Sequence, residues 1–319
     1  MGLFDKKFCD ICGEKISLLG NRKLEDGNMC KDCAHKISPF MTDRRRTTIA
    51  DMKEHLAYRE ENKAKLREVF ASLGQGSLLD IIDIDNSALG NMESKRYISA
   101  ATYLRFFIPE LLPKDIDKVL YLDDDILVRH DIGELYRTDI SNYPIGAVRD
   151  RFMEPKYYRR YGIAKGTPVF NAGIMLINLK NWRKTGIHKK ALAYSAETGL
   201  NDQISLNKLL AGNWLGLDYK WNMVSGYYRR YYNYAANKIY QFPFDNVPER
   251  IKDPYILHTT GGKKLSDYSY KYLFVDEYFR YLDMTPWRDY KPADVNLFTV
   301  IDRVYNRVRI KIIDMINRK

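Results

Sequence analysis

An apolar run interrupted by three adjacent carboxylates constrains the fold of this chain more than any other feature. The run covers residues 118–135, KVLYLDDDILVRHDIGEL, with the acids at Asp123, Asp124 and Asp125. Its first half predicts a short buried strand, so the acids stand where that strand leaves the core. In an open α/β sheet, ligands bind beyond the carboxyl ends of strands, where such acids can hold a divalent cation. An acidic surface turn is the commoner explanation of an isolated Asp triplet.

The length and charge of the chain limit its partners. Its 319 residues can form one medium domain and a small one. The net charge of +11 favours anionic partners, such as nucleic acid, acidic lipid or a phosphorylated substrate. Neither a signal peptide nor a run of about 18 apolar residues is evident, so we expect a cytoplasmic protein without a spanning helix.

All four cysteines lie near the N-terminus, at Cys9, Cys12, Cys30 and Cys33. Two C-x2-C pairs at this spacing can converge on zinc, and so short a segment needs such a clamp to fold. Disulfides are the alternative, and they are rare in the cytoplasm. Four thiolates leave no open coordination position, which predicts a structural site. The segment also resembles a small zinc-binding domain of bacterial proteins of uncertain role.

The rest of the chain alternates between predicted helices and strands. Residues 47–70 predict a solvated helix or linker, in which Thr48 and Asp51 are spaced as a capping box. Glycine and serine mark a boundary at residues 72–77. We then expect a strand through residue 84, a helix over 99–112, strands from residues 118, 145 and 169 and at 254–258, and helices from about 181 and 202. This order predicts a mixed, mostly parallel α/β sheet covered on both faces.

Five segments in this part resemble the family 8 glycosyltransferases in their order and approximate separation. The segments are YLRFFIPELLP with Arg105, DKVLYLDDDILV with Asp123 and Asp125, FNAGIMLINLKNW with Asn171 and Gly173, the pair Asp202 and Gln203, and HTTGGKK with His258. They span residues 99–258 within a resemblance that covers about residues 76–285. The family implies a Rossmann-like GT-A fold and retaining transfer from a nucleotide sugar.

The resemblance also implies a metal site. Asp123, Asp125 and His258 would hold manganese or magnesium, and Lys264 would meet the diphosphate of the donor. The chemistry agrees, because two carboxylates with an imidazole suit manganese. A hydrogen-bonded core histidine is the alternative for His258. Arg105 would either bind the nucleotide or pair with an acid.

Other residues would form the sugar site by the same resemblance. Asn171 and Gly173 would shape the pocket for sugar and acceptor, and Asp150 would lie near one of these sugars. Asp202 and Gln203 would lie beside the anomeric carbon as the catalytic pair. Asp202 can also cap a helix, and one residue can do both.

Two departures from the family pattern bear on activity. Family members begin with a strand, helix and strand that hold uridine and ribose, whereas only about eight residues here separate the charged helix from LLDIIDID. We infer that this unit is missing and that the fold is truncated at its N-terminus. Lys264 also lacks the Pro-Trp that usually follows. We hypothesise that the activity of this chain alone is impaired or absent.

Two further stretches have alternative explanations. Aromatic residues crowd residues 219–234, where they either stack on sugars or pack in the core. Residues 295–319 form a basic amphipathic helix, which would lie on an anionic membrane surface or dock on the catalytic domain. Its apolar positions are Leu297, Ile301, Val304, Val308, Ile312 and Met315.

These observations predict four parts: a zinc-ribbon-like module at 1–43, a charged helix and linker at 44–75, a glycosyltransferase domain at 76–290 and an amphipathic helix at 291–319. The predicted function is metal-dependent hexosyl transfer, of galactose or glucose, from a UDP-sugar to a cell-envelope glycan or lipopolysaccharide-type acceptor. Such an enzyme would be peripheral on the inner membrane face. The alternative is a catalytically impaired scaffold whose zinc module recruits a partner. Nucleic-acid binding is disfavoured, because the basic residues are dispersed and no recognition helix is evident.

Overall fold

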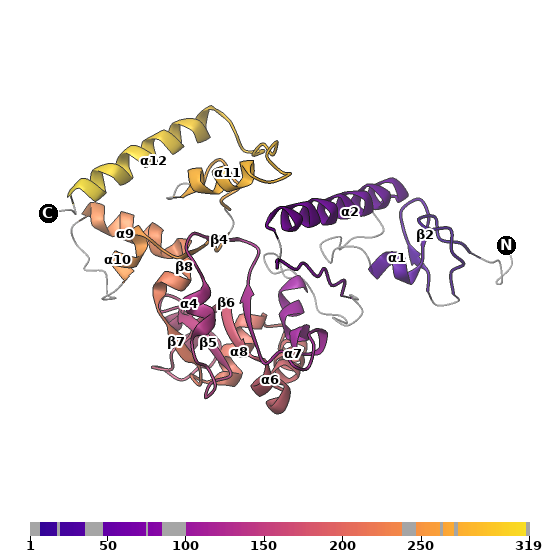
Figure 1. Ribbon diagram of the computed structural model, residues 1–319, viewed down its shortest axis with the longest axis horizontal. Helices are drawn as coiled ribbons and strands as arrows, with labels where there is room; N and C mark the ends of the chain where they lie inside the picture. The colour runs from indigo at the N-terminus through magenta and orange to yellow at the C-terminus, as the bar shows by residue number, and fades with distance from the viewer. Residues whose placement is uncertain are drawn as a thin grey trace. The chain divides into compact units, whose positions relative to one another are not determined.

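The computed structural model describes residues 7–17, 20–35, 47–74, 76–84, 100–237, 247–261, 264–270 and 274–316. The chain forms two compact units (Figure 1). The first unit consists of Met1–Leu111 with Tyr194–Asn201, and the second of Leu112–Ala193 with Asp202–Lys319.

The first unit has a small core at its N-terminal end. A hairpin of β1 (Arg22–Lys23) and β2 (Asn28–Met29) precedes α1 (Lys31–His35), and the long helix α2 (Ile49–Ser72) follows. The predicted capping box begins α2, since Thr48 Oγ1 accepts from Asp51 N at 3.1 Å and Asp51 Oδ2 accepts from Thr48 N at 2.9 Å. Met52 is buried in a cluster with the cysteines, which ties the first turn of α2 to this module.

The strand predicted to run through residue 84 is wrong for residues 78–84. This segment carries no strand, and Leu78 is 91% exposed. Arg59 and Lys63 of α2 pair instead with Asp83. The alternation of Leu, Ile and Asp matches the period of a strand. However, Asp83 forms ion pairs with Arg59 and Lys63 of α2, and within the described part of the chain the segment does not pair with another strand.

The helix predicted over residues 99–112 is confirmed in its described part. It consists of the 3-10 helix η3 (Ala100–Phe107) and the helix α3 (Ile108–Leu111), while residue 99 lies outside the described residues.

The second unit is organised around β6 (Phe170–Asn178), which is buried along almost its whole length. A four-stranded sheet has the order β3-β6-β5-β7, and a three-stranded sheet the order β4-β9-β8. The other strands are β3 (Lys118–Leu122), β4 (Ile126–Val128), β5 (Ile145–Arg149), β7 (Leu215–Leu217), β8 (Met223–Val224) and β9 (Ile256–His258).

The predicted mixed sheet is confirmed, but the predicted excess of parallel strands is not. β6 runs antiparallel to both β3 and β5, and β4 runs antiparallel to β9. The parallel pairs among the described residues are β5 with β7 and β8 with β9. An apolar run predicts that a strand is buried, but it does not predict whether the strand runs parallel or antiparallel to its neighbours.

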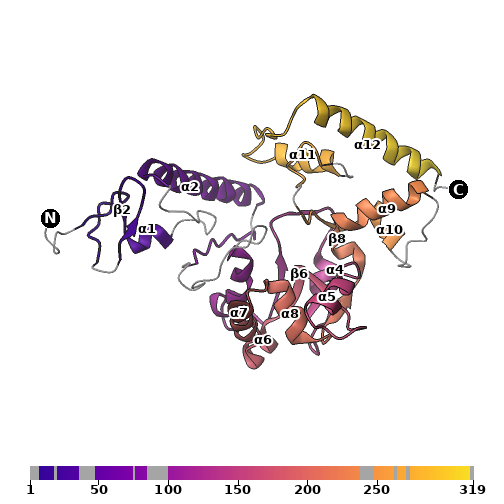
Figure 2. The same ribbon diagram turned by 180° about the vertical axis from the view of Figure 1, so that it is seen from behind.

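Helices flank these sheets. They are α4 (Gly133–Arg137), α5 (Glu154–Arg160), α6 (Leu179–Thr185), α7 (Ile187–Thr198), α8 (Asp202–Leu210), the 3-10 helix η4 (Tyr219–Trp221), α9 (Ser225–Asn237), α10 (Val247–Lys252) and α11 (Val275–Asp283). Both α6 and α8 pack against β6 (Figure 2). The helix expected from residue 181 begins two residues earlier, and the side chain of Asn178 caps it by accepting from Asn181 N at 2.9 Å.

The aromatic stretch mainly builds the core. Trp221, Tyr227, Tyr228, Tyr231 and Tyr232 are all buried. Packing therefore explains these five rings, whereas the side chain of Tyr234 lies outside the described ones.

The C-terminal helix α12 (Leu297–Ile316) docks through one face on α9 and α11. Ile310 and Ile313 are buried among the tyrosines of α9, and Arg309 donates to Tyr232 O at 3.0 Å. The opposite face leaves nine apolar residues more than half exposed: Leu297, Phe298, Ile301, Val304, Tyr305, Val308, Ile312, Met315 and Ile316. In the part of the chain that the structure describes, no helix combines the length and the apolar character that a membrane span requires.

Candidate metal and sugar site

The turn between β3 and β4 holds the acidic residues in place. Asp123 N donates to Gly173 O of β6 at 2.8 Å, and Tyr121 Oη donates to Asp123 Oδ1 at 2.7 Å. The carbonyl of Asp125 accepts from both Thr259 N, at 2.9 Å, and Thr259 Oγ1, at 2.8 Å. Two neighbouring strands therefore fix the backbone of the acidic turn.

Asp123, Asp125 and His258 lie together, as the sequence predicts. One ligand atom from each lies within 4.8 Å of the others. His258 Nε2 is 3.1 Å from Asp125 Oδ1 and 3.8 Å from Asp123 Oδ2. The antiparallel register of β4 and β9 places Ile126 opposite His258, which carries the imidazole to the acids. Asp124 is exposed to solvent, as expected for the middle residue of the triplet.

A chain of hydrogen bonds fixes the tautomer of His258. The N–H of Gly173 can only donate, and it donates to Asn171 Oδ1 at 3.0 Å. The same oxygen accepts from Asn222 Nδ2 at 2.9 Å, so Asn222 presents its Oδ1 to His258 Nδ1 at 3.0 Å. Nδ1 must therefore carry the proton, which leaves Nε2 to face the carboxylates. Metal-bound histidines are commonly oriented by such a partner on the second ring nitrogen.

Gly173 leaves the room that the ligand side chains occupy. A Cβ added there would lie 2.1 Å from His258 Cε1 and 2.7 Å from Asp123 Oδ2. Any side chain at this position would displace both groups. The oxygen and nitrogen donors, the fixed tautomer and the room that Gly173 leaves for these side chains fit a site for manganese or magnesium.

Lys264 joins the same cluster. Its Nζ contacts Asp125 Oδ2 and donates to Thr259 O at 3.2 Å. Burial alone would raise the pKa of Asp125, but hydrogen bonds and charges from His258 and Lys264 outweigh it and lower that pKa to about 2. In place of the missing Pro-Trp support, Leu265 is buried and Lys264 N donates to Asp267 Oδ2 at 2.7 Å.

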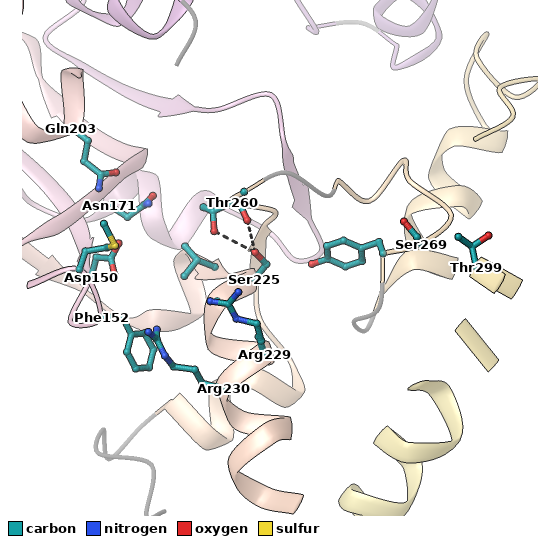
Figure 3. Close-up of a pocket in the computed structure, with 15 residues that line it drawn as sticks. Asp150, Phe152, Asn171, Gln203, Ser225, Arg229, Arg230, Thr260, Ser269 and Thr299 are labelled. Atoms are coloured by element: carbon teal, nitrogen blue, oxygen red, sulfur yellow. Dashed lines mark hydrogen bonds between the residues drawn. The ribbon is translucent and has the colours of Figure 1, made fainter. Parts of the chain in front are cut away.

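A cavity of about 820 Å³ adjoins this cluster (Figure 3). Its lining includes three of the predicted sugar-site residues, Asp150, Asn171 and Gln203. Gln203 is held from two sides, because its Oε1 accepts from Ala172 N and its Nε2 donates to Tyr157 Oη, each at 2.9 Å.

Two of the predicted carboxylates in this region are buried. Burial raises the pKa of Asp150 to about 6, although a hydrogen bond from Met153 N and the charge of Arg230 oppose the rise. Asp202 is buried as the first residue of α8, where its predicted catalytic role stays a prediction.

For Arg105, the predicted choice between binding the nucleotide and pairing with an acid stays a prediction. Arg105 belongs to the first unit, where its Nε donates to Thr102 O at 3.0 Å.

Three residues near the site were not predicted from the sequence, and they are Asn222, Arg229 and Arg230. Asn222 directly precedes β8, so its proximity to His258 depends on the pairing of β8 with β9.

The four cysteines form a second cluster, within the first unit. All are free thiols whose sulfur atoms lie within 4.8 Å of one another. Burial raises the pKa of Cys9, but backbone N–H groups of Cys30, Cys12 and Ile11 outweigh it and lower that pKa to about 7. Burial and the neighbouring thiols raise the pKa of Cys33. Such a cluster fits a cation that keeps every sulfur deprotonated, as zinc does.

Two known protein families match the chain. The model described as "Glycosyl transferase family 8" matches residues 42–264, and "Domain of unknown function (DUF4428)" matches residues 7–55. The first match covers well over half of the chain, and the second contains all four cysteines.

Individual curated proteins are also similar to this chain. The chain is 29% identical over 234 residues to General stress protein A of Bacillus subtilis (strain 168), covering 71% of this chain and 79% of that protein. It is 32% identical over 174 residues to the glycosyltransferase GlyA of Streptococcus pneumoniae, but these span 22% of GlyA.

A solved structure agrees with the fold. The galactosyltransferase LgtC, in complex with donor and acceptor sugar analogues, is 27% identical with a TM-score of 0.59, over 74% of this chain and 84% of that one. The expected α/β fold of the GT-A type is thereby confirmed.

Proposed function

Because this chain belongs to glycosyltransferase family 8, we propose that it transfers galactose or glucose from a UDP-sugar to a cell-envelope glycan or lipopolysaccharide-type acceptor, with retention of configuration. The observation that carries this proposal is the convergence of Asp123, Asp125 and His258 beside a cavity lined by Asn171 and Gln203. Galactose is the first donor sugar to test, because the similar LgtC is a galactosyltransferase.

Asp123, Asp125 and His258 would hold manganese or magnesium. When bound there, the ion would neutralise negative charge on the departing nucleoside diphosphate. Lys264 would add a positive charge and hydrogen-bond donors for the same phosphates. Its Nζ contacts the Asp125 carboxylate, so it lies next to the ion that would bind them.

Gln203 and Asp202 would act on the sugar. Two hydrogen bonds hold the amide of Gln203 before any substrate binds, so its position needs no reorganisation. A fixed polar side chain beside the anomeric carbon stabilises positive charge that develops there. The acceptor hydroxyl would attack from the face that the diphosphate leaves, and the departing phosphate oxygen would take its proton. Asp150 would orient the acceptor hydroxyl.

A donor screen tests this proposal. Full-length protein with manganese is offered UDP-galactose, UDP-glucose and other UDP-sugars, and hydrolysis and transfer are both measured. Turnover of one donor by the wild type, lost in Asp123→Ala and Asp125→Ala, would support the proposal. Silence with every donor would favour the alternative.

That alternative is a catalytically impaired scaffold that recruits a partner through its zinc module. The observation in its favour is that the described residues from 47 to 84 form the helix α2 and no strand, whereas family members would have a strand, helix and strand that hold uridine and ribose ahead of residue 78. Calorimetric titration of UDP with manganese separates the two candidates. Micromolar binding would defeat the scaffold, and the absence of binding would defeat the enzyme.

The outward face of α12 supports a further part of the proposal, peripheral attachment to an anionic membrane. Its nine exposed apolar residues would enter the acyl boundary, and cations such as Lys311 would meet the lipid headgroups. Substituting Leu297, Phe298 and Ile301 with serine should abolish cosedimentation with phosphatidylglycerol vesicles. Tyr281→Ser on α11 is the matched control. Unchanged binding of the triple variant would refute the attachment.

A further inference from the structure

The cavity beside the candidate metal site carries two arginines that none of the roles above uses. Arg229 and Arg230 lie in the second turn of α9, and both line the cavity. Figure 3 shows both guanidinium groups reaching from α9 toward the side that Asp150 and Phe152 form.

The two arginines differ in what they contact. The guanidinium carbon of Arg230 lies 3.6 Å from the centroid of the Phe152 ring, and its charge lowers the pKa of Asp150. Stacking on an aromatic face holds a guanidinium in place. Arg229 has no hydrogen bond or ion pair to any described residue and is exposed. Its charge is therefore available to a ligand.

The rest of the lining adds positive rather than negative potential. Asp150 is the one carboxylate among the described lining residues. Ser225 and Gly226 also line the cavity, so α9 directs its N-terminus toward it. The first turn of a 13-residue helix carries a partial positive charge and unpaired N–H groups. The hydroxyl groups of Ser225, Ser269 and Thr299 also line the cavity, but they already donate to Thr260 O, Asp294 Oδ2 and Asp294 O, so the positive potential comes from the two arginines and the start of α9.

We propose that Arg229 and Arg230 bind an anionic group, a phosphate or a carboxylate, on the acceptor. This inference rests on the proposed function, which places donor and acceptor sugars at Asn171, Gln203 and Asp150. Guanidinium groups pair with phosphate or carboxylate through two parallel hydrogen bonds, a geometry that neutral sugars do not offer. The donor diphosphate is the other source of such an anion, but Lys264 and the metal ion that Asp123, Asp125 and His258 would hold already provide a place for it.

Paired sugars that differ only in charge test the proposal. Full-length protein, saturated with UDP and manganese, is titrated with glucose, glucose 6-phosphate and glucuronate. The charged sugars should bind at least about tenfold more tightly than glucose, as expected of a charge-assisted pair. The double variant Arg229→Gln with Arg230→Gln should remove that difference. Arg159→Gln is the matched control, because Arg159 is exposed on α5 and does not line the cavity.

The affinity for UDP itself separates the two sources of the anion. It should be the same in the double variant and the wild type. A tenfold loss of UDP affinity without discrimination between the sugars would assign the arginines to the donor and overturn the proposal. Equal binding of charged and neutral sugars, or no binding of the charged ones, would also overturn it.

Failure of the proposed function has a different signature. If the chain is not a glycosyltransferase that uses a UDP-sugar, UDP with manganese would not bind the wild type. The sugar titrations would then be repeated without UDP, and the same tenfold preference would still be required.

Discussion

The four-cysteine cluster and the cluster of Asp123, Asp125 and His258 could each hold one ion, but they are built in opposite ways. The cysteines come from one short segment, and backbone N–H groups donate to their sulfurs. The second cluster joins the ends of strands far apart in the sequence, and side-chain amides orient its imidazole. Four thiolates close a coordination shell, whereas three ligands leave positions for a substrate. The first arrangement suits folding and the second suits chemistry.

Removing the zinc ligands should have the largest effect. Cys30→Ser should unfold residues 7–35, because structural zinc in such small modules contributes about 10–16 kcal/mol. The second unit has its own core and should keep its fold. Amide exchange measured by mass spectrometry checks both units at once. If β6 unfolded together with the cysteine module, the cysteine site would not act on the fold of its own segment alone, and the contrast between the two clusters would be wrong.

Removing a ligand of the second cluster should act on chemistry instead. Asp125→Asn should lower turnover of the preferred UDP-sugar at least about 100-fold, because the metal site loses a charged ligand. The second unit should keep its fold but melt at a somewhat lower temperature, because the lowered pKa of Asp125 means that its carboxylate stabilises the folded state through His258 and Lys264. Steady-state kinetics and calorimetry measure the two effects. Loss of stability without loss of turnover would contradict this assignment.

Asp150 should show that the sugar site is maintained at a cost in stability. Its pKa of about 6 lies above the unfolded value of 3.8, so the folded state binds the proton more tightly. The stability this provides is complete below pH 3.8 and is lost as the pH rises to 6. Asp150→Asn should therefore raise the free energy of unfolding by up to about 3 kcal/mol at pH 8 and by little near pH 4. Urea unfolding at both values measures this, and equal effects would refute it.

Asn222→Leu should have the smallest effect of this series. Without its Oδ1, the tautomer of His258 is no longer fixed, and loss of such a partner typically weakens metal binding about 10–100-fold. The Michaelis constant for manganese should rise more than kcat falls. Asn222→Asp keeps an acceptor for Nδ1 and should bind manganese more tightly than Asn222→Leu. Equal losses in the two variants would reduce Asn222 to a packing residue.

Both clusters were predicted from the sequence, the cysteines from their spacing and Asp123, Asp125 and His258 from the resemblance to family 8. Paired cysteines report zinc by spacing alone, and Asp123 and Asp125 follow an apolar strand. Asn222 has no such pattern, since its role depends on the register of β8 with β9. Arg229 and Arg230 were hidden in an aromatic run that mainly packs the core.

The errors in the predicted fold have a similar origin. Residues 78–84 have the period of a strand, but a strand also needs a neighbour, and Asp83 pairs with α2 instead. The direction of each strand depends on the path of the segments that connect it to the next strand, and this path cannot be predicted from apolar content. The docking of α12 was one of two predicted alternatives, and the helix has both a buried face and an exposed one.

The most direct test of two distinct ion sites is a count of both metals on the same protein. Zinc per chain is measured by atomic emission, and manganese binding by electron paramagnetic resonance with saturating UDP, in the wild type and in His258→Ala. We predict one zinc in both proteins, and one manganese in the wild type that is lost in the variant. Equal manganese binding in the two proteins, or joint loss of zinc and manganese, would contradict the account.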